Sequence, residues 1–421
     1  MLIEFLKKIY AKASFDTITN SNEEHMSFED QKAFVDHFPE PSDDFERSYY
    51  KYQCWKKHYF AKKKLQLLLF NMGAIVLLPV MGGRLKRNFR SLNNDKTNKY
   101  DAVIENVPRL PNTDVIPQEI LDSFEHCVEI TEMNYLDGIL GKQGLALCKD
   151  LRRRYFFCFY FRLITTLKIA QFENYLLQFR PEAIIFYSYE REFTGPLQTY
   201  LCEQYGSRFI SYMHGDVIYS MAFAFQRYSE QYIWGEEYNE LFDELRCTFS
   251  MKTYTPKKLE GIAVSLPEKE CAFYATYYFS DETRGCAEII RKIFDTFKNR
   301  SLRCKIRPHP RYSDMAMLNE VFKGYYIENP RNYSLSESIT QSLYIIGLNT
   351  TVLSEAYFSG KKVVIDDVSK EGEYQELFKK KYVMLFRPHI KLSELTSQDS
   401  AYDSSFRFYE SPQEQHCSIN G

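Results

Sequence analysis

The sequence predicts an α/β fold of two doubly wound parallel-sheet domains, preceded by an N-terminal helical segment. At 421 residues the chain exceeds what a single core usually holds. From about Tyr100 onward, short β-branched or aromatic runs alternate with helical segments, a pattern typical of βαβ units. A stretch bearing Pro and Lys, residues 253–270, separates two series of such units. We therefore predict boundaries at 1–95, 96–262 and 263–421.

Composition and charge exclude several classes of protein. A net charge of −2 provides no overall field for nucleic acid, so we expect no nucleic-acid partner. The 10 cysteines are scattered without Cys-x-x-Cys spacing, which predicts reduced thiols and no metal site. The N-terminus lacks the apolar stretch of a secretory signal. These features together predict a cytoplasmic protein.

The N-terminal segment contains a mainly apolar run, Leu65–Met81, with basic residues on both sides. The run is shorter than the roughly 20 residues of a spanning helix and is interrupted by Pro79. We expect a helix or helical hairpin that dips into the inner face of a membrane, with its cations on anionic headgroups. A buried core helix is the alternative. The flanking cations are Lys62, Lys63, Lys64, Arg84, Lys86, Arg87 and Arg90.

The domain that follows is predicted to alternate strand and helix. Residues 183–187 and 208–216 are predicted strands, and the helix between them ends at Gly206. A further strand reaches Trp234-Gly235 and is followed by a helix. Since parallel strands end at one edge of a sheet, their loops are expected to gather there.

The last domain repeats this pattern. Residues 271–280 are a predicted strand, and Ser280 is the expected N-cap of the helix after it. Later strands are predicted at 302–311, 343–347 and 362–367, with a helix at 352–360.

The first candidate site residue is His309, which stands between Pro308 and Pro310 at a strand end. Proline fixes its own φ and restricts the residue before it, so the imidazole is expected to be held rigidly among cations. Ligands bind at the carboxyl ends of parallel strands, which favours a functional role; a backbone cap is the alternative. Arg307 and Arg311 flank this motif.

The second candidate is the loop Asn349-Thr350-Thr351, which follows a strand and opens a helix. Hydroxyls and unpaired backbone N–H groups at a helix N-terminus suit a phosphate or carboxylate. Glu355, one turn further on, could reach a sugar hydroxyl from the same face. An ordinary Thr or Asn cap is the alternative.

The third candidate is His214-Gly215-Asp216 at a strand exit of the first domain. His214 or Asp216 could deprotonate an acceptor hydroxyl; a simple turn is the alternative. Glu190 is a weaker acceptor-side candidate.

These motifs, within about residues 180–370, resemble bacterial surface-polysaccharide glycosyltransferases of the GT-B architecture, in which two Rossmann-type domains face a cleft. His309-Pro310 and the loop Asn349-Thr350-Thr351 with Glu355 are similar to motifs that sialyltransferase-like capsule transferases use to hold a CMP-activated acidic sugar. In that family the first-domain motif has two acidic residues before glycine, whereas this chain has Met213-His214-Gly215.

The resemblance implies metal-independent transfer of an acidic sugar, sialic-acid-like or Kdo-like, from a CMP donor to a capsule, O-antigen or lipid-linked glycan at the inner membrane face. It implies no cofactor beyond the nucleotide sugar. His214-Gly215 with Trp234-Gly235 also resembles teichoic-acid polyol-phosphate transferases, which use CDP donors. A non-catalytic polysaccharide-binding or assembly protein is the remaining alternative. The donor-binding residues implied are Arg307, Pro310, Arg311, Asn349, Thr350, Thr351 and Glu355, and the catalytic ones are His214, Asp216 and His309.

Overall fold

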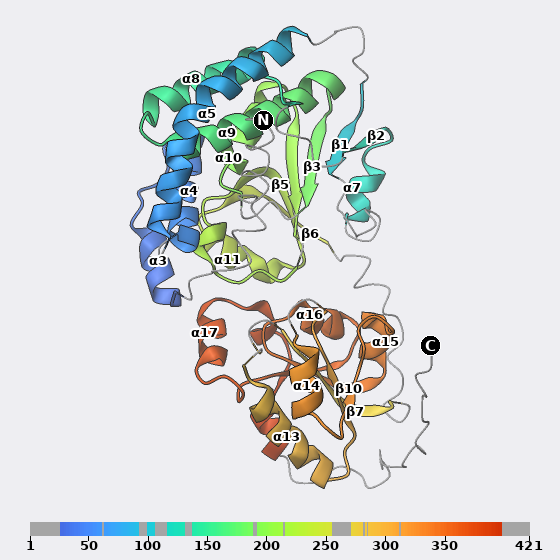
Figure 1. Ribbon diagram of the computed structural model, residues 1–421. Helices are drawn as coiled ribbons and strands as arrows, with labels where there is room; N and C mark the ends of the chain where they lie inside the picture. The colour runs from blue at the N-terminus through green and yellow to red at the C-terminus, as the bar shows by residue number, and fades with distance from the viewer. Residues whose placement is uncertain are drawn as a thin grey trace, which may run out of the picture. The chain divides into compact units, whose positions relative to one another are not determined.

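The chain divides into two compact units in a computed structural model. One unit comprises residues 1–214 and 219–256, and the other comprises 215–218 and 257–421. Each contains a six-stranded parallel sheet with helices packed against it (Figure 1). The prediction of two doubly wound α/β units is therefore confirmed. The structure describes residues 26–60, 63–91, 99–105, 116–130, 137–187, 192–213, 215–254, 271–280, 283, 285–310 and 313–397.

The sheet of the first unit has the order β2-β1-β3-β4-β5-β6, and every pairing is parallel. Apolar residues of its central strands are fully buried, which explains why these strands are continuous apolar runs in the sequence. The strands are β1 (Ala102–Glu105), β2 (Cys127–Ile130), β3 (Ala183–Tyr187), β4 (Arg208–Tyr212), β5 (Arg227–Ile233) and β6 (Thr248–Thr253).

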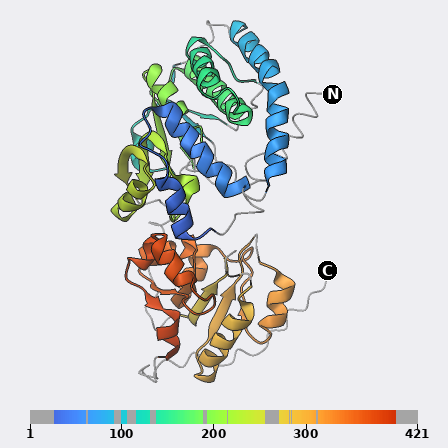
Figure 2. The same ribbon diagram turned by 90° about the vertical axis from the view of Figure 1, so that its left-hand side faces the viewer.

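The helices on one face of this sheet form two layers. α9 (Phe159–Phe179) and α10 (Gly195–Gln204) lie against the strands, and α4 (Asp44–Phe60), α5 (Lys64–Arg90) and α8 (Lys142–Arg154) pack on them (Figure 2). The N-terminal helices therefore share the core of the first unit, with Trp55 and Tyr59 almost fully buried in it. The remaining helices of this unit are α3 (Phe28–Asp36), α7 (Gln118–Asp122), η4 (Met221–Phe223), η5 (Glu236–Tyr238) and α11 (Asn239–Glu244).

The N-terminus of α8 is held by a buried carboxylate on α9. Glu173 accepts hydrogen bonds from the backbone N–H groups of Gly141 (2.7 Å) and Gly144 (2.9 Å) and from the Tyr205 hydroxyl (2.7 Å). A Cβ at Gly144 would lie 2.0 Å from the Glu173 carboxylate, so this close approach requires glycine. Burial raises the pKa of Glu173, and these three donors act in the opposite direction.

The predicted apolar segment is one continuous helix, α5, that contains Pro79, and the helical-hairpin alternative is wrong. Its inward stripe contacts the core through Ala74, Met81 and Leu85, which are buried. It is long and apolar enough to cross a membrane by length and composition.

The sheet of the second unit has the order β9-β8-β7-β10-β11-β12, again all parallel. From β7 the chain proceeds outward to β8 and β9, and from β10 it proceeds in the opposite direction. This order places a topological switch point between β7 and β10. The strands are β7 (Phe273–Tyr278), β8 (Cys304–Arg307), β9 (Tyr326–Ile327), β10 (Ser342–Gly347), β11 (Lys362–Ile365) and β12 (Ile390–Lys391).

Helices cover both faces of this second sheet. α13 (Ala287–Asn299), α14 (Met315–Val321) and α18 (Leu392–Ser397) pack on one face, and α15 (Leu335–Thr340), α16 (Thr351–Phe358) and α17 (Glu373–Lys379) on the other. A short turn, η7 (Val383–Leu385), precedes β12.

The expected N-cap of α13 is wrong. The helix begins at Ala287 with Cys286 as its cap, seven residues after Ser280. Ser280 instead belongs to a tight loop, because its backbone N–H donates to Thr283 Oγ1 (2.9 Å), and that hydroxyl donates back to the Ser280 carbonyl (3.2 Å).

Candidate functional site

The carboxyl ends of β7 and β10 have the strand arrangement at which open α/β sheets commonly bind ligands. Because the connections leave these neighbouring strands in opposite directions, a crevice is expected between their ends. The residues that follow are Phe279-Ser280 after β7 and Leu348 to Thr351 after β10. His309 follows β8, the strand on the other side of β7.

The predicted polar loop after β10 does begin a helix. Thr350 is the N-cap of α16, and its hydroxyl accepts from the Val352 N–H (3.4 Å). The Thr350 carbonyl accepts from the Tyr382 hydroxyl (3.2 Å), which fixes the entry to the helix. The capping interpretation therefore holds for the Thr350 side chain. Asn349 and Thr351 are half-buried beside the positive end of the helix dipole.

Gly347 allows this loop to turn tightly over the end of β10. A Cβ at Gly347 would lie 2.8 Å from Thr350 Cγ2, so a larger residue would displace the helix cap. A short turn at this position brings the first N–H groups of α16 to the sheet edge.

Ser280 is a candidate site residue that the sequence analysis assigned to another role. Its side chain is 7% exposed, and its hydroxyl has no hydrogen-bond partner among the described residues. A buried polar atom of this kind costs free energy unless a ligand or water satisfies it. The signal in the sequence is a serine directly after a buried strand at the switch point.

His309 is half-buried just beyond β8, in a loop closed by Ser313. The His309 backbone N–H donates to Ser313 Oγ (2.8 Å), and the Ser313 N–H donates to the His309 carbonyl (3.3 Å). Pro308 is buried and Pro310 exposed, so the imidazole lies where the chain emerges from the core. Arg311 falls outside the described residues, and its role stays a prediction.

Arg307 lies in a buried ionic network beneath this loop. Its guanidinium pairs with Glu328 and donates to the Tyr333 carbonyl (3.1 Å). Glu328 is fully buried and also accepts from Lys305 Nζ (2.6 Å) and Ser338 Oγ (2.5 Å). Burial alone would raise the pKa of Glu328, but these donors together lower it. The structure thus gives Arg307 a role in fixing the end of β8, from which the His309 loop leaves, and its contact with a donor stays a prediction.

A second Arg-Pro-His tripeptide, Arg387-Pro388-His389, occurs in the same unit. It precedes β12 and therefore lies at the amino end of the sheet, opposite to His309. His389 is engaged there, with Nδ1 2.8 Å from the Arg387 carbonyl and Nε2 3.0 Å from the Tyr374 hydroxyl. The two tripeptides have the same sequence but lie at opposite edges of the sheet. His389 is therefore a matched control for substitutions of His309.

Asp216 is grouped with the second unit, although we expected it on the first domain. Its carboxylate accepts from Ser354 Oγ (2.6 Å) on the first turn of α16. The adjacent Gly215 approaches Thr351 so closely that a Cβ would lie 3.1 Å from its hydroxyl. The structure therefore brings Asp216 beside the α16 N-terminus. His214 and Glu190 lie outside the described residues, and their roles stay predictions.

Glu355 lies half-buried on α16 within electrostatic range of the end of β7. Burial raises the pKa of Tyr278 above its ordinary value, and the negative charges of Glu328 and Glu355 add to this effect. The Tyr278 hydroxyl is 2.8 Å from Ser338 Oγ. The role of Glu355 toward a sugar hydroxyl stays a prediction.

Acidic pairs in this unit serve local structure. Asp366, buried after β11, accepts from the Tyr277 hydroxyl (2.5 Å) and the Ser369 N–H (2.9 Å), and Asp367 accepts from Ser393. Over the described ranges, no group of three His, Cys, Asp or Glu side chains could hold a metal ion.

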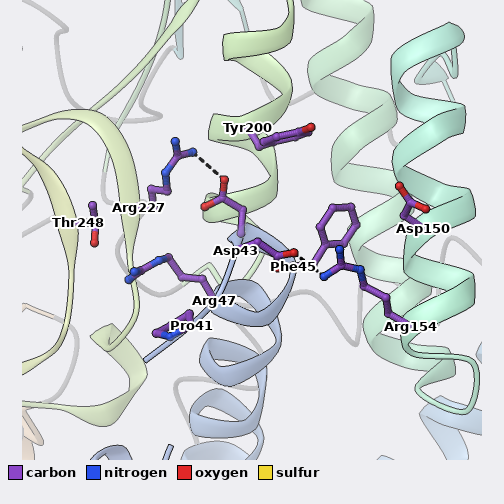
Figure 3. Close-up of a pocket in the computed structure, with 10 residues that line it drawn as sticks. Pro41, Asp43, Phe45, Arg47, Asp150, Arg154, Tyr200, Arg227 and Thr248 are labelled. Carbon is purple, nitrogen blue, oxygen red and sulfur yellow. Dashed lines mark hydrogen bonds and ion pairs between the residues drawn. The ribbon is translucent and has the colours of Figure 1, made fainter. Parts of the chain in front are cut away.

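A pocket of about 360 Å³ in the first unit lies at the amino ends of β5 and β6 (Figure 3). Its arginines are paired with acidic residues: Arg227 lies 3.2 Å from Asp44, and Arg154 pairs with Asp43. Burial raises the pKa of Asp44 to about 6, while Arg227 acts to lower it. These pairs join the start of α4 to the sheet and to α8, so we assign the pocket a structural role.

We predict that Glu328→Leu destabilises the second unit by about 3 to 5 kcal/mol, because it leaves the buried Lys305 and Arg307 cations without their carboxylate. Urea unfolding measures this loss. The control, Glu337→Gln in the exposed capping box of α15, should leave stability nearly unchanged, because Gln can also close a capping box. Equal losses for the two variants would contradict a special role for the buried network.

We predict that Asp44→Asn gains stability relative to the parent protein as pH rises from about 4 to 7. A folded pKa raised from 3.8 to about 6 means that stability present at low pH is lost as the carboxyl ionises through that window. The difference should be on the order of 1 kcal/mol at pH 7, since the carboxyl is partly solvated. Unfolding curves of both proteins at pH 4.5 and 7 test this, and a pH-independent difference would refute it.

No family model and no curated protein matches the chain. Solved structures similar to it include the calicheamicin glycosyltransferase CalG4 (TM-score 0.42, 11% identity, 73% of this chain and 91% of that chain). The wall teichoic acid polymerase TagF is similar at a TM-score of 0.38 and 9% identity, over 79% of this chain and 87% of that chain. UDP-GlcNAc 2-epimerase from Methanocaldococcus jannaschii, in complex with UDP-GlcNAc and UDP, is similar at a TM-score of 0.39 and 11% identity. The match covers 68% of this chain and 92% of that chain. At these identities the likeness to such GT-B proteins concerns the fold alone.

Proposed function

We propose that the protein is a glycosyltransferase whose second unit binds a nucleotide-activated sugar at the switch point between β7 and β10. The observation that carries this proposal is the pairing of two anion-binding features there. The buried Ser280 hydroxyl has no partner among the described residues, and the α16 N-terminus begins after the adjacent strand.

The leaving phosphate gains negative charge as the glycosidic bond breaks. Fixed donors aimed at that charge act more strongly on the transition state than on the bound substrate. We assign this task to Ser280, the α16 N-terminus with Asn349 and Thr351, and His309. The ionic network of Lys305, Arg307 and Glu328 fixes the end of β8 directly before His309, which would limit reorganisation during the reaction.

The acceptor hydroxyl must lose a proton to a base. His214 and Asp216 are the proposed candidates, with Glu190 as the weaker one. Asp216 accepts from Ser354 Oγ, and the adjacent Gly215 lies close to Thr351. A carboxylate at this place fits a base that works beside the donor.

The finer proposal is a CMP-activated acidic sugar, sialic-acid-like or Kdo-like, transferred to a capsule, O-antigen or lipid-linked glycan. It draws on the resemblance of His309-Pro310 and the Asn349-Thr350-Thr351 loop to CMP-sugar transferases. A CDP-polyol phosphotransferase is the second candidate, favoured by His214-Gly215 and Trp234-Gly235. Incubation of the pure protein with CMP-sugars, UDP-sugars and CDP-glycerol would distinguish these donors by which one is consumed. Binding without consumption of any donor would instead support a non-catalytic polysaccharide-binding protein.

We propose that the reaction takes place at the cytoplasmic face of the plasma membrane, where a lipid-linked acceptor would be available. The apolar helix α5 and its flanking cations support this location. No metal ion or cofactor beyond the nucleotide sugar is part of the proposal.

His309→Ala should lower the rate of donor consumption by on the order of a hundredfold, because one preorganised donor to the leaving phosphate is lost. The matched control is His389→Ala, which removes the other Arg-Pro-His imidazole at the opposite sheet edge and should leave the rate within about twofold. Circular dichroism establishes that both variants fold. Equal rates for the two variants would remove His309 from the site.

Ser280→Ala should weaken donor binding or turnover by about tenfold or more while leaving stability nearly unchanged, since its hydroxyl has no protein partner to lose among the described residues. Thr296→Ala on the outer side of α13 serves as the control. Nucleotide affinity by calorimetry and thermal unfolding measure the two effects. A large loss of stability with unchanged affinity would show that Ser280 is structural.

A further inference from the structure

We propose that the outward face of α5, together with the turn between α8 and α9, is a single surface that lies in the plane of an anionic lipid membrane. We call this surface the lipid face; it specifies which residues of the protein would contact the membrane. It rests on the proposed function only in the assignment to the membrane side that carries the acceptor.

The outward side of α5 is apolar from Leu65 to Val80. Large apolar side chains recur on it at i, i+3, i+4 and i+7 from Leu65 to Val80, and Leu65 is 71% exposed. Polar residues lie instead toward the protein: Asn71 is half-buried and accepts from the Tyr160 N–H (3.2 Å). A helix on a water-exposed surface shows the opposite pattern. The exposed large apolar residues of the helix are Leu65, Leu68, Leu69, Met72, Ile75, Val76, Val80 and Phe89.

Cations lie on the outward side at both ends of this apolar stretch. Lys64 is exposed before it, and Lys86, Arg87 and Arg90 are exposed in the last turns. The sequence contains no Asp or Glu between Glu46 and Asp95. An apolar stripe that begins and ends in positive charge is complementary to a bilayer surface with anionic headgroups.

The turn before α9 adds a second apolar point next to α5. Phe157 is 81% exposed and Phe156 is 47% exposed. The first turn of α9 is fixed against α5, because Tyr160 stacks on Phe70 at 5.4 Å between ring centroids and bonds to Asn71. Arg152 and Arg153, both exposed, precede the turn. The lipid face thus has two apolar elements, each accompanied by arginine or lysine.

The contacts of α5 favour a helix that lies in the membrane plane. Its inward stripe packs on α9 and the core along much of its length, from Leu67 to Leu85. A helix that crossed the bilayer would have to leave these contacts. In the membrane plane, α5 can keep its inward contacts with the protein while its exposed apolar stripe is buried at the headgroup boundary.

A second copy of the chain fits this face poorly. Pairing two α5 helices in parallel places Lys86, Arg87 and Arg90 against their own copies. Pairing them antiparallel places these residues against Lys63 and Lys64 of the other copy. Both arrangements bring like charges together with no acidic residue on either helix, which disfavours association. Anionic lipid compensates the same charges.

The test is flotation of the full-length protein with vesicles of phosphatidylcholine alone or with 30% phosphatidylglycerol. We expect binding to the anionic vesicles that weakens as salt is raised. Charge reversal of Lys86, Arg87 and Arg90 to Glu should reduce partitioning by more than about a hundredfold, and Phe157→Ser by roughly tenfold. Ile289→Ser, at an exposed apolar residue of the second unit, is the matched control and should bind like the parent protein.

Three results would overturn the proposal. The protein could stay in solution with anionic vesicles as a monomer, or it could form a dimer that Leu68→Ser and Val76→Ser dissociate. The charge and Phe157 variants could also bind vesicles as the parent does. Donor consumption measured without vesicles reports separately on the glycosyltransferase proposal, so the failure of either is distinguishable.

Discussion

The parallel pairing of β7 with β10 is the constraint from which the site in the second unit follows. Tyr277 is in register with Ile346, so both strands end at the same level. Their onward connections diverge, and the polar residues after each strand therefore meet at one edge instead of being covered by a crossover helix. Ser280 and the α16 N-terminus would each bind an anion only weakly on their own. Their common position at one sheet edge is the basis of the proposed donor site.

The buried network around Glu328 has a different kind of importance. A buried ion pair seldom adds net stability, because the desolvation cost of the charges offsets their attraction. Glu328, which directly follows β9, instead links β8 to α15: it pairs with Lys305 and Arg307 of β8 and accepts from Ser338 of α15. The chain that carries His309 therefore leaves the core along one fixed path. The network thus orders the end of β8 without adding much net stability, as is common where a site must be ordered before its ligand binds.

The sequence was sufficient to predict the strands with long apolar runs, such as 183–187 and 343–347, because strands covered on both faces have few polar residues. It placed His309 at a carboxyl end correctly. The prediction for Ser280 was wrong. Serine is a common helix N-cap, but the Ser280 backbone bonds to Thr283 in a loop and the helix begins later, at Ala287. Asp216 was assigned to the wrong side because its partner, Ser354, is distant in sequence. The apolar run near residue 70 also predicted a helix, but a continuous run does not indicate which side of the helix the protein covers.

Residues 215–218 are integrated into the second unit, although residues on both sides of them belong to the first. Gly215 approaches Thr351, Asp216 bonds to Ser354, and Ile218 packs in the core beside α16. A fragment that starts at residue 257 would thus lack part of its own interior, even though it contains every strand of its sheet. Residues 215–218 are therefore a structural component of the second unit. A truncated second unit would need them, either in the same chain or added as a separate peptide.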